Sequence, residues 1–244
     1  MILLLLLLAV PLSAHNGAVA IAVPVEGIVV DGDLSDWPEG MLSYPIERRL
    51  WGEPLGSEGD FKGEFRIGYH AQENALYIAV EVQDDSVVRQ FKGSSDSQDG
   101  CEISIRPVHQ DTAMALVNYR LWGEEPGVVG PGSVEEFDVE VVWEEQAYQY
   151  EWRVQLDNAS VRLESGTVVG FDLALWDRDE DGSTSWLAWG PGGSKEYFAD
   201  AIGDLLLVGA NERIGAVHGR VSWADDGRPV EHAAAARILP TASR

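Results

Sequence analysis

Apolar and polar residues alternate along most of the chain between residues 25 and 208. Three segments have an apolar residue at every second position: Leu76, Ile78, Val80 and Val82; Tyr150, Trp152, Val154 and Leu156; and Val169, Phe171, Leu173 and Leu175. A period of two places one face of a strand on a core and the other towards solvent or a second layer. These segments are therefore predicted to be β-strands.

Polar breaks separate the alternating segments in the way that turns do. Asn74 lies in one break, which is predicted to be a hairpin loop, and residues 144–147 form another. The 26 glycines and 11 prolines are spread between the strand patterns, and no segment has the periodicity of an amphipathic helix. The pattern predicts an all-β protein, a β-sandwich of two antiparallel sheets with roughly ten strands.

The N-terminus has the composition of a secretory signal peptide. Residues 2–9 are a nearly unbroken leucine run that is too short to span a bilayer, and no Lys or Arg precedes it. Ala18-Val19-Ala20 is an A-x-A cleavage pattern, and Ala14 offers an earlier one. We expect residues 1–20 to be removed and the protein to be secreted, periplasmic or at the cell surface. No later segment is long and apolar enough to be a transmembrane helix.

The organisation changes after Val208, so residues 21–208 are predicted to be the β-sandwich. Residues 209–215 have the composition of a linker. A strand pattern at 219–223, a turn at Asp225-Asp226-Gly227 and a Pro-Val strand at 228–233 resemble the start of a carboxypeptidase-regulatory-like β-domain. We interpret 209–244 as a linker and the start of a second, truncated β-domain, joined to further domains after residue 244. The alternative is a disordered tail.

The charge of the chain excludes two classes of partner. Asp and Glu number 41 against 17 Lys and Arg, a net charge of −24. A surface this negative repels phosphate backbones and anionic lipid headgroups, whereas neutral ligands and cations remain compatible with it. Cys101 is the only cysteine, so the chain forms no internal disulfide and no cysteine-based zinc site.

Several segments, in this order, resemble the family 9 carbohydrate-binding modules: VDGDLSDW at 30–37, NALYIAVEVQDD at 74–85, QDGCEISI at 98–105, YEWRV at 150–154, GFDLALWD at 170–177, WLAW at 186–189 and GDLLL at 203–207. The resemblance covers about residues 25–208. It implies a β-sandwich that holds a glucan- or xylan-type poly- or oligosaccharide between aromatic side chains, as a non-catalytic module of a larger exported protein such as a glycoside hydrolase, a receptor or a sensor.

The resemblance also implies site residues. Glu102 stands where the family has a glutamate that accepts hydrogen bonds from sugar hydroxyls, and Asn118 matches a site asparagine. The two clamp tryptophans of the family fall at Asp96 and near Glu196-Tyr197, so Tyr197 is the candidate for one wall and Phe91 is the nearest aromatic for the other. Leu116 and Ala174 replace a site arginine and a site glutamine.

Two acidic turns are candidates for a structural Ca²⁺ site. Asp177, Asp179 and Asp181 form a D-x-D-x-D-G string with Gly182, and oxygens at alternate positions of such a turn can converge on one ion. Asp31 and Asp33 form the second candidate. The resemblance implies structural calcium as well, without fixing its ligands. The alternative for each turn is an acidic hairpin without metal.

The sequence gives little support to catalysis, because it contains no G-x-S-x-G, no H-E-x-x-H and no glycine-rich phosphate loop. One alternative function is a structural or interaction sandwich that has lost its sugar site. Another is a haem-binding relative that uses His70 and Met114. Among the nine tryptophans, Trp51 and Trp122 lie in loops that contain Gly or Pro and are expected to be exposed.

Overall fold

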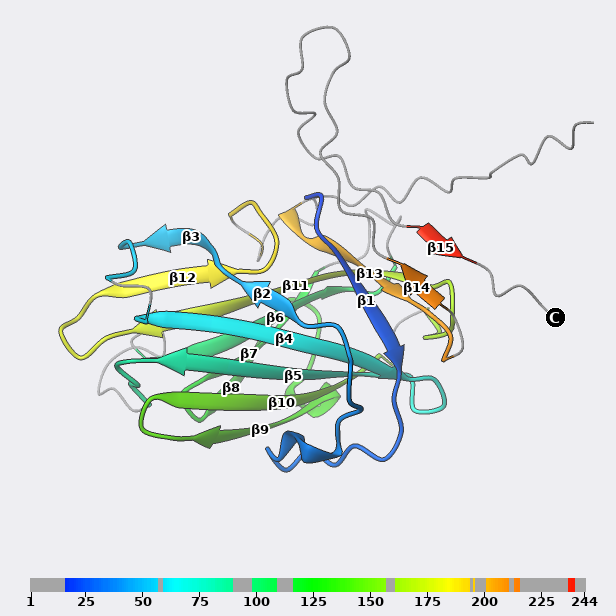
Figure 1. Cartoon of the computed structure of the whole chain (residues 1–244), viewed down its shortest axis with the longest axis horizontal. Coiled ribbons are helices and arrows are strands. Elements are labelled where there is room, and N and C mark those ends of the chain that lie inside the picture. The colour runs from blue at the N-terminus through cyan, green and yellow to red at the C-terminus, as the bar shows by residue number, and fades with distance from the viewer. Residues whose placement is uncertain are drawn as a thin grey trace, which may run out of the picture.

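The computed structural model describes residues 16–56, 59–89, 98–108, 116–156, 161–193, 195 and 201–210, and the backbone of 213–215 and 237–239. Thirteen strands are joined into one hydrogen-bonded sheet that curls into two layers, with no α-helix in the described part (Figure 1). The all-β sandwich predicted from the sequence is confirmed. The sheet has three strands more than the ten or so expected. Strands β2, β3 and β8 are short, so they show no alternating pattern in the sequence.

The first layer has the order β8-β7-β6-β11-β13-β1, and β12 and β3 continue it beside the second half of β11. Its strands are β1 (Val19–Pro24), β3 (Arg48–Gly52), β6 (Gly100–Arg106), β7 (Val117–Trp122), β8 (Glu125–Val129), β11 (Val168–Arg178), β12 (Thr184–Ala188) and β13 (Gly203–Leu207). All neighbours in this layer are antiparallel except β1 and β13.

The second layer has the order β1-β4-β5-β10-β9, with β2 beside β4. Its own strands are β2 (Tyr44–Ile46), β4 (Phe61–His70), β5 (Ala75–Asp84), β9 (Phe137–Trp143) and β10 (Ala147–Gln155). Strand β1 belongs to both layers, since residues 19–22 pair with β13 and Val23 and Pro24 pair with β4, in parallel both times. This is the exception to the predicted antiparallel arrangement, and it arises because one strand crosses from one sheet to the other.

Aromatic rings from the two layers meet in the core. Phe65 of β4 lies 5.6 Å from Phe171 of β11, and Tyr119 of β7 lies 5.4 Å from Phe137 of β9. The alternating apolar residues identified in the sequence are all buried in this core. Burial of large aromatic side chains is the main favourable contribution to such a sandwich.

A buried carboxylate explains the Asp-Gly-Asp turn near the N-terminus. Glu151 of β10 accepts hydrogen bonds from the backbone N–H groups of Asp31 and Gly32 and from Nε1 of Trp37. The short 3₁₀ helix η1 (Leu34–Asp36) lies within this turn; the second, η2 (Val134–Glu136), precedes β9. The turn packs Trp37 on the outer side of β5, which is why both faces of that strand are buried.

The sandwich begins before residue 21. Strand β1 starts at Val19, Ala20 is fully buried, and the side chain of Asn16 donates to Asp172 Oδ2 and to the carbonyls of Pro191 and Ala201. The expected boundary after Ala20 therefore falls inside β1, whereas the earlier cleavage option after Ala14 leaves all these contacts intact.

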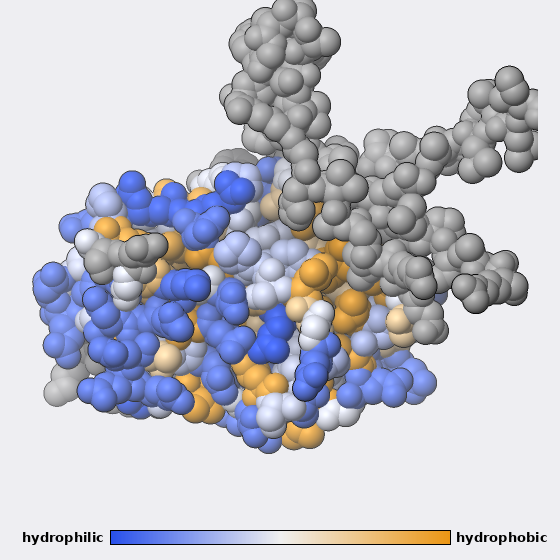
Figure 2. Space-filling view, viewed as in Figure 1, coloured by the Kyte–Doolittle hydropathy of each residue, from blue (hydrophilic) through white to orange (hydrophobic). Residues whose placement is uncertain are grey.

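Beyond the sandwich, β14 (Arg213–Gly215) and β15 (Arg237–Leu239) form a separate antiparallel pair. The other residues of the expected second domain lie outside the described part. The hydrophilic residues that dominate the face in Figure 2 agree with the high content of charged side chains. No helix in the described residues has the length and apolar character needed to cross a membrane.

Candidate functional site

The candidate sugar site lies on the outer side of β6 and β7, called here the β6–β7 face and defined by Glu102, Ser104, Asn118 and Arg120. Glu102 lies between Cys101 and Ile103, which point into the core. Because side chains alternate along a strand, Glu102 and Ser104 point to the opposite side. Register pairs Glu102 with Arg120 and Ser104 with Asn118, so the four side chains form two adjacent cross-strand pairs.

An ion pair forms the first of these pairs. Arg120 Nε lies 2.7 Å from Glu102 Oε2, and both side chains are largely buried, with 12% and 1% of their surfaces exposed. A buried carboxylate needs a charged or hydrogen-bonding partner, and Arg120 supplies it. The arginine fixes the position of the carboxylate that the sequence identified as the acceptor for sugar hydroxyls.

Asn118 belongs to the second pair. Its Oδ1 accepts a hydrogen bond of 2.6 Å from the hydroxyl of Ser104, and the asparagine is fully buried. Glu102 and Asn118 are the two predicted sugar-site residues that the structure describes. It brings them onto neighbouring cross-strand pairs of one face. Tyr197 and Phe91 lie outside the described residues, so both stay predictions.

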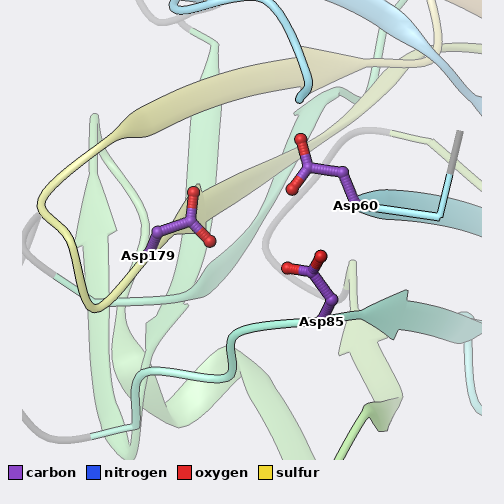
Figure 3. A group of neighbouring side chains, drawn as sticks. All are labelled: Asp60, Asp85 and Asp179. Atoms are coloured by element: carbon purple, nitrogen blue, oxygen red, sulfur yellow. The ribbon is translucent and has the colours of Figure 1, made fainter. Parts of the chain in front are cut away.

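A second candidate site is an acidic cluster of Asp60, Asp84, Asp85, Asp177 and Asp179. Asp60 immediately precedes β4 and Asp84 ends β5, and these ends coincide because Phe61 pairs with Asp84. Carboxylate oxygens of Asp60, Asp85 and Asp179 lie within 4.8 Å of one another, as do those of Asp84, Asp177 and Asp179. Figure 3 shows the carboxylates of the first three pointing towards one another.

Comparison with known families decides the identity of the sandwich. The sequence model of the family described as "Carbohydrate family 9 binding domain-like" matches residues 30–210. The chain belongs to this family. Family membership confirms the recognition made from the sequence motifs, and with it carbohydrate binding and a non-catalytic binding module. The matched residues end before the segment expected to resemble a carboxypeptidase-regulatory-like domain.

Solved structures agree with this fold. A family 9 module from Caldicellulosiruptor kristjanssonii in complex with glucose has a TM-score of 0.66 and 18% sequence identity, over 82% of this chain and 100% of that one. The same module in complex with cellotriose matches equally, with 18% identity and 83% of this chain covered. At this identity the likeness shows the fold alone. No curated protein matches the chain.

The family 9 pattern of site residues is only partly kept on the β6–β7 face. Ala174 of β11 pairs with Glu102 but offers only a methyl group where the family has a glutamine. Leu116 replaces the family arginine just before β7. The sequence analysis missed Arg120, although its position, two residues after Asn118, places it on the same face as the replaced arginine.

Each of the two carboxylate triads in the acidic cluster has a spacing of oxygens that suits a calcium ion. Ca²⁺ takes six to eight oxygen ligands at about 2.3–2.6 Å, so ligand oxygens around one ion lie within about 5 Å of one another. Asp84 and Asp177 are each 2% exposed, and Asp84 Oδ2 and Asp177 Oδ1 have no hydrogen-bond partner among the described residues. Buried carboxylate oxygens without donors are the atoms that a cation would bind.

The pKa values of the carboxylates in the acidic cluster also favour a bound cation. Burial, reinforced by neighbouring carboxylates, raises the pKa of Asp84 to about 6 and that of Asp177 to about 8. Asp99 lies beside the cluster, and burial raises its pKa to about 9. Its two oxygens accept from the backbone N–H groups of Arg178 and Val88, so it ties the end of β11 to the segment that follows β5. Without a cation, ionisation of these carboxylates is therefore less favourable than ionisation of a free aspartate.

The structure separates the predicted calcium ligands. Asp177 and Asp179 are in the acidic cluster, whereas Asp181 is exposed and its Oδ1 accepts from the backbone N–H of Ser183. Asp31 and Asp33 are in neither group: Asp31 Oδ1 accepts from the N–H of Asp33, and Asp33 caps η1. The sequence missed Asp60, Asp84 and Asp85, because a strand pairing brings them to Asp179.

The described residues do not test the haem alternative, which pairs His70 with Met114. Met114 lies outside the described residues, and Nδ1 of His70 accepts a hydrogen bond from the backbone N–H of Glu73. This alternative stays an untested prediction of the sequence.

Proposed function

We propose that the domain binds a neutral poly- or oligosaccharide of the glucan or xylan type at the β6–β7 face, without catalysing a reaction. The observation that carries this proposal is the adjacency of Glu102 and Asn118 on one sheet face. A carboxylate and a primary amide together accept and donate the hydrogen bonds that sugar hydroxyls need, and a hydroxyl buried without partners costs about 1–3 kcal/mol.

Each residue of the face has a role in this proposal. Glu102 accepts from sugar hydroxyls, Arg120 holds the carboxylate in place, and the amide of Asn118 is oriented by Ser104. Tyr197 and Phe91 are proposed as the aromatic walls for the apolar C–H face of the sugar. The net charge of −24 favours a neutral glycan over an anionic one.

We also propose that the acidic cluster binds structural Ca²⁺. Asp60, Asp84, Asp85, Asp177 and Asp179 would hold the ion, which offsets the repulsion between the carboxylates. The residues come from the segments that border β4, β5 and β11, so a bound ion would fix the loops at one end of the sandwich. In this account the metal has no part in sugar chemistry.

The domain is further proposed to be part of a longer exported protein. The leucine-rich N-terminus and the strand pair β14–β15 after the sandwich support this arrangement. The chain would be secreted, periplasmic or at the cell surface, and the further domains would include a glycoside hydrolase, a receptor or a sensor.

A glycan array followed by polysaccharide pull-down tests the proposal. The wild type is expected to bind glucan- or xylan-type glycans, Asn118→Ala to bind them weakly, and Ser104→Ala to lose less, because serine only orients the amide. The wild type is expected to release no reducing sugar from xylan. Absence of binding to every glycan on the array would remove the proposal.

A second candidate function is a structural or interaction sandwich without a working sugar site. The observation that favours it is the burial of Glu102 and Asn118, which are 1% and 0% exposed. A crystal structure after soaking with cellotriose distinguishes the two candidate functions. Electron density for the sugar on the β6–β7 face supports sugar binding, and a β6–β7 face without sugar density supports the second candidate.

A further inference from the structure

Four tryptophans form a row across five strands of the first layer, on the same side as the β6–β7 face. Register pairs Trp51 of β3 with Trp186 of β12, Trp186 with Trp176 of β11, Trp176 with Gly100 of β6, and Gly100 with Trp122 of β7. Side chains directly opposite one another in a sheet share one face. We call these four side chains the tryptophan row.

The rings of the row contact one another. Trp176 and Trp186 are stacked, with centroids 5.2 Å apart and planes 12° apart. Trp51 lies 6.5 Å from Trp176 on one side, and Trp122 lies 6.2 Å from it on the other. A side chain at Gly100 would collide with the indole of Trp122, so the glycine makes the contact across β6 possible.

The tryptophan row is separate from the main core. Trp176 and Trp186 pack in a small cluster of their own with Leu50, Ala174 and Ala188. Trp51 is 60% exposed, whereas the other aromatic side chains in the described part of the chain are buried or half-buried. Exposure of an indole on top of other indoles is typical of a binding surface, because a fold gains little from an aromatic ring left in water.

The row continues into the proposed sugar site. The guanidinium of Arg120 lies 5.1 Å from the ring centre of Trp122, and the same arginine pairs with Glu102. Charge at the other end of the row disfavours an anionic ligand: Glu53, two residues after Trp51, lines a hollow with Glu180 and Asp181, which are not among the proposed calcium ligands. These carboxylates repel an anionic glycan, so the surface suits a neutral one.

We propose that the tryptophan row is an extended aromatic subsite that contacts a neutral glycan chain of several sugar units, with Trp51 as its outermost contact. The inference rests on the proposed function and extends its ligand beyond one sugar. The ring centres of Trp51 and Trp122 lie 6.5 and 6.2 Å from that of Trp176, on opposite sides of it, so the row extends beyond the reach of a single sugar unit. The apolar C–H face of a pyranose packs on the exposed ring of Trp51 and on the accessible parts of Trp122 and Trp176, whereas the buried Trp186 supports Trp176 by stacking.

Isothermal titration with glucose, cellohexaose and xylohexaose tests the subsite, because only the hexaoses reach beyond a single-sugar site. The wild type is expected to bind one hexaose more tightly than glucose. Trp51→Ala is expected to weaken hexaose binding about threefold to tenfold and leave glucose binding unchanged, and Trp51→Phe to recover most of the loss. Val29→Ala, at an apolar side chain that is equally exposed, is the matched control and should change neither.

The outcomes separate this inference from the proposed function. If the wild type binds sugars and Trp51→Ala binds the hexaoses as tightly, the subsite is wrong and the proposed function stands. An equal loss of glucose and hexaose binding also overturns an extended subsite. If the wild type binds none of the three sugars, the proposed function fails and the subsite fails with it. Trp122→Ala gives a second test from the other end of the row, with its melting temperature measured to confirm folding.

Discussion

Arg120 and Glu102 face each other on neighbouring strands, with Nε 2.7 Å from Oε2 and both side chains largely buried. Removal of one partner from such a pair leaves an uncompensated charge and destabilises a protein by about 3–5 kcal/mol. We expect Glu102→Leu to lower the free energy of unfolding by this amount in urea. The double variant Glu102→Leu with Arg120→Leu should recover most of the loss, because replacement of both charges by apolar groups is often neutral. A single variant as stable as the wild type would contradict a charged, buried pair.

Calcium should raise the stability of the domain. Binding to the native state alone adds about 2.7 kcal/mol at a hundredfold excess over Kd, which corresponds to about 5–10 °C in melting temperature for a chain of this size. The measurement is a thermal melt in EDTA and in millimolar CaCl₂, with Mg²⁺ as the control for charge screening.

Two matched variants locate the site. Asp179→Asn is expected to abolish most of the calcium shift, because Asp179 belongs to both carboxylate groups. Asp181→Asn should keep the shift, since that side chain accepts from Ser183 and lies outside both groups. Equal melting temperatures of the wild type in EDTA and in Ca²⁺ would contradict the proposed structural calcium site.

Without calcium, stability should fall as pH rises. The pKa values of Asp84, Asp177 and Asp99 in the folded state are about 6, 8 and 9, whereas an unfolded aspartate titrates near 4. Between about pH 4 and 9 the folded state therefore binds more protons than the unfolded state, and the free energy of unfolding decreases with pH. Urea titrations in EDTA at pH 5 and pH 8 measure this, and Asp177→Asn should reduce the difference. Higher stability at pH 8 than at pH 5 would contradict the raised pKa values.

The fold could be predicted because its cause is local. A period of two in the segments around Leu76, Trp152 and Phe171 is enough to give strands with one buried face. The crossing of β1 between the layers could not be predicted in this way. Its short apolar stretch shows neither its parallel partners nor the anchoring of Asn16 by Asp172, which is 156 positions away.

The residues of the two candidate sites could likewise be predicted where they form a local motif and not where strand pairing brings them together. Glu102 and Asn118 were predicted as site residues from the family resemblance, and the register of β6 and β7 brings them onto one face. The residues of the acidic cluster, which are the proposed calcium ligands, were predicted only where they share one turn, at Asp177 and Asp179, and were missed where strand ends converge. The tryptophan row was missed for the same reason: Trp51 and Trp122 were expected in loops, and only the register of five strands aligns them with Trp176 and Trp186.

The N-terminus of the mature protein should be His15. Cleavage after Ala14 keeps Asn16 and the whole of β1, whereas cleavage after Ala20 removes three side-chain hydrogen bonds and the pairs of Val19 and Ala20 with β13. At about 1 kcal/mol per hydrogen bond, a chain that starts at Ile21 should lose about 3 kcal/mol or more relative to one that starts at His15. Mass spectrometry of the exported protein gives the cleavage position, and thermal melts of the two forms give the difference. A mature protein that begins at Ile21 with equal stability would contradict the role of Asn16.

The central claim is that the domain binds a neutral sugar at the β6–β7 face, and isothermal titration with cellotriose and xylotriose in millimolar CaCl₂ tests it most directly. The account predicts saturable binding of at least one of these sugars by the wild type. It also predicts that Asn118→Ala, which leaves the Glu102–Arg120 pair in place, weakens that binding at least about tenfold without a comparable loss of stability, a factor that corresponds to about 1.4 kcal/mol. No binding of either sugar by the folded wild type, or equal affinity in Asn118→Ala, would contradict it.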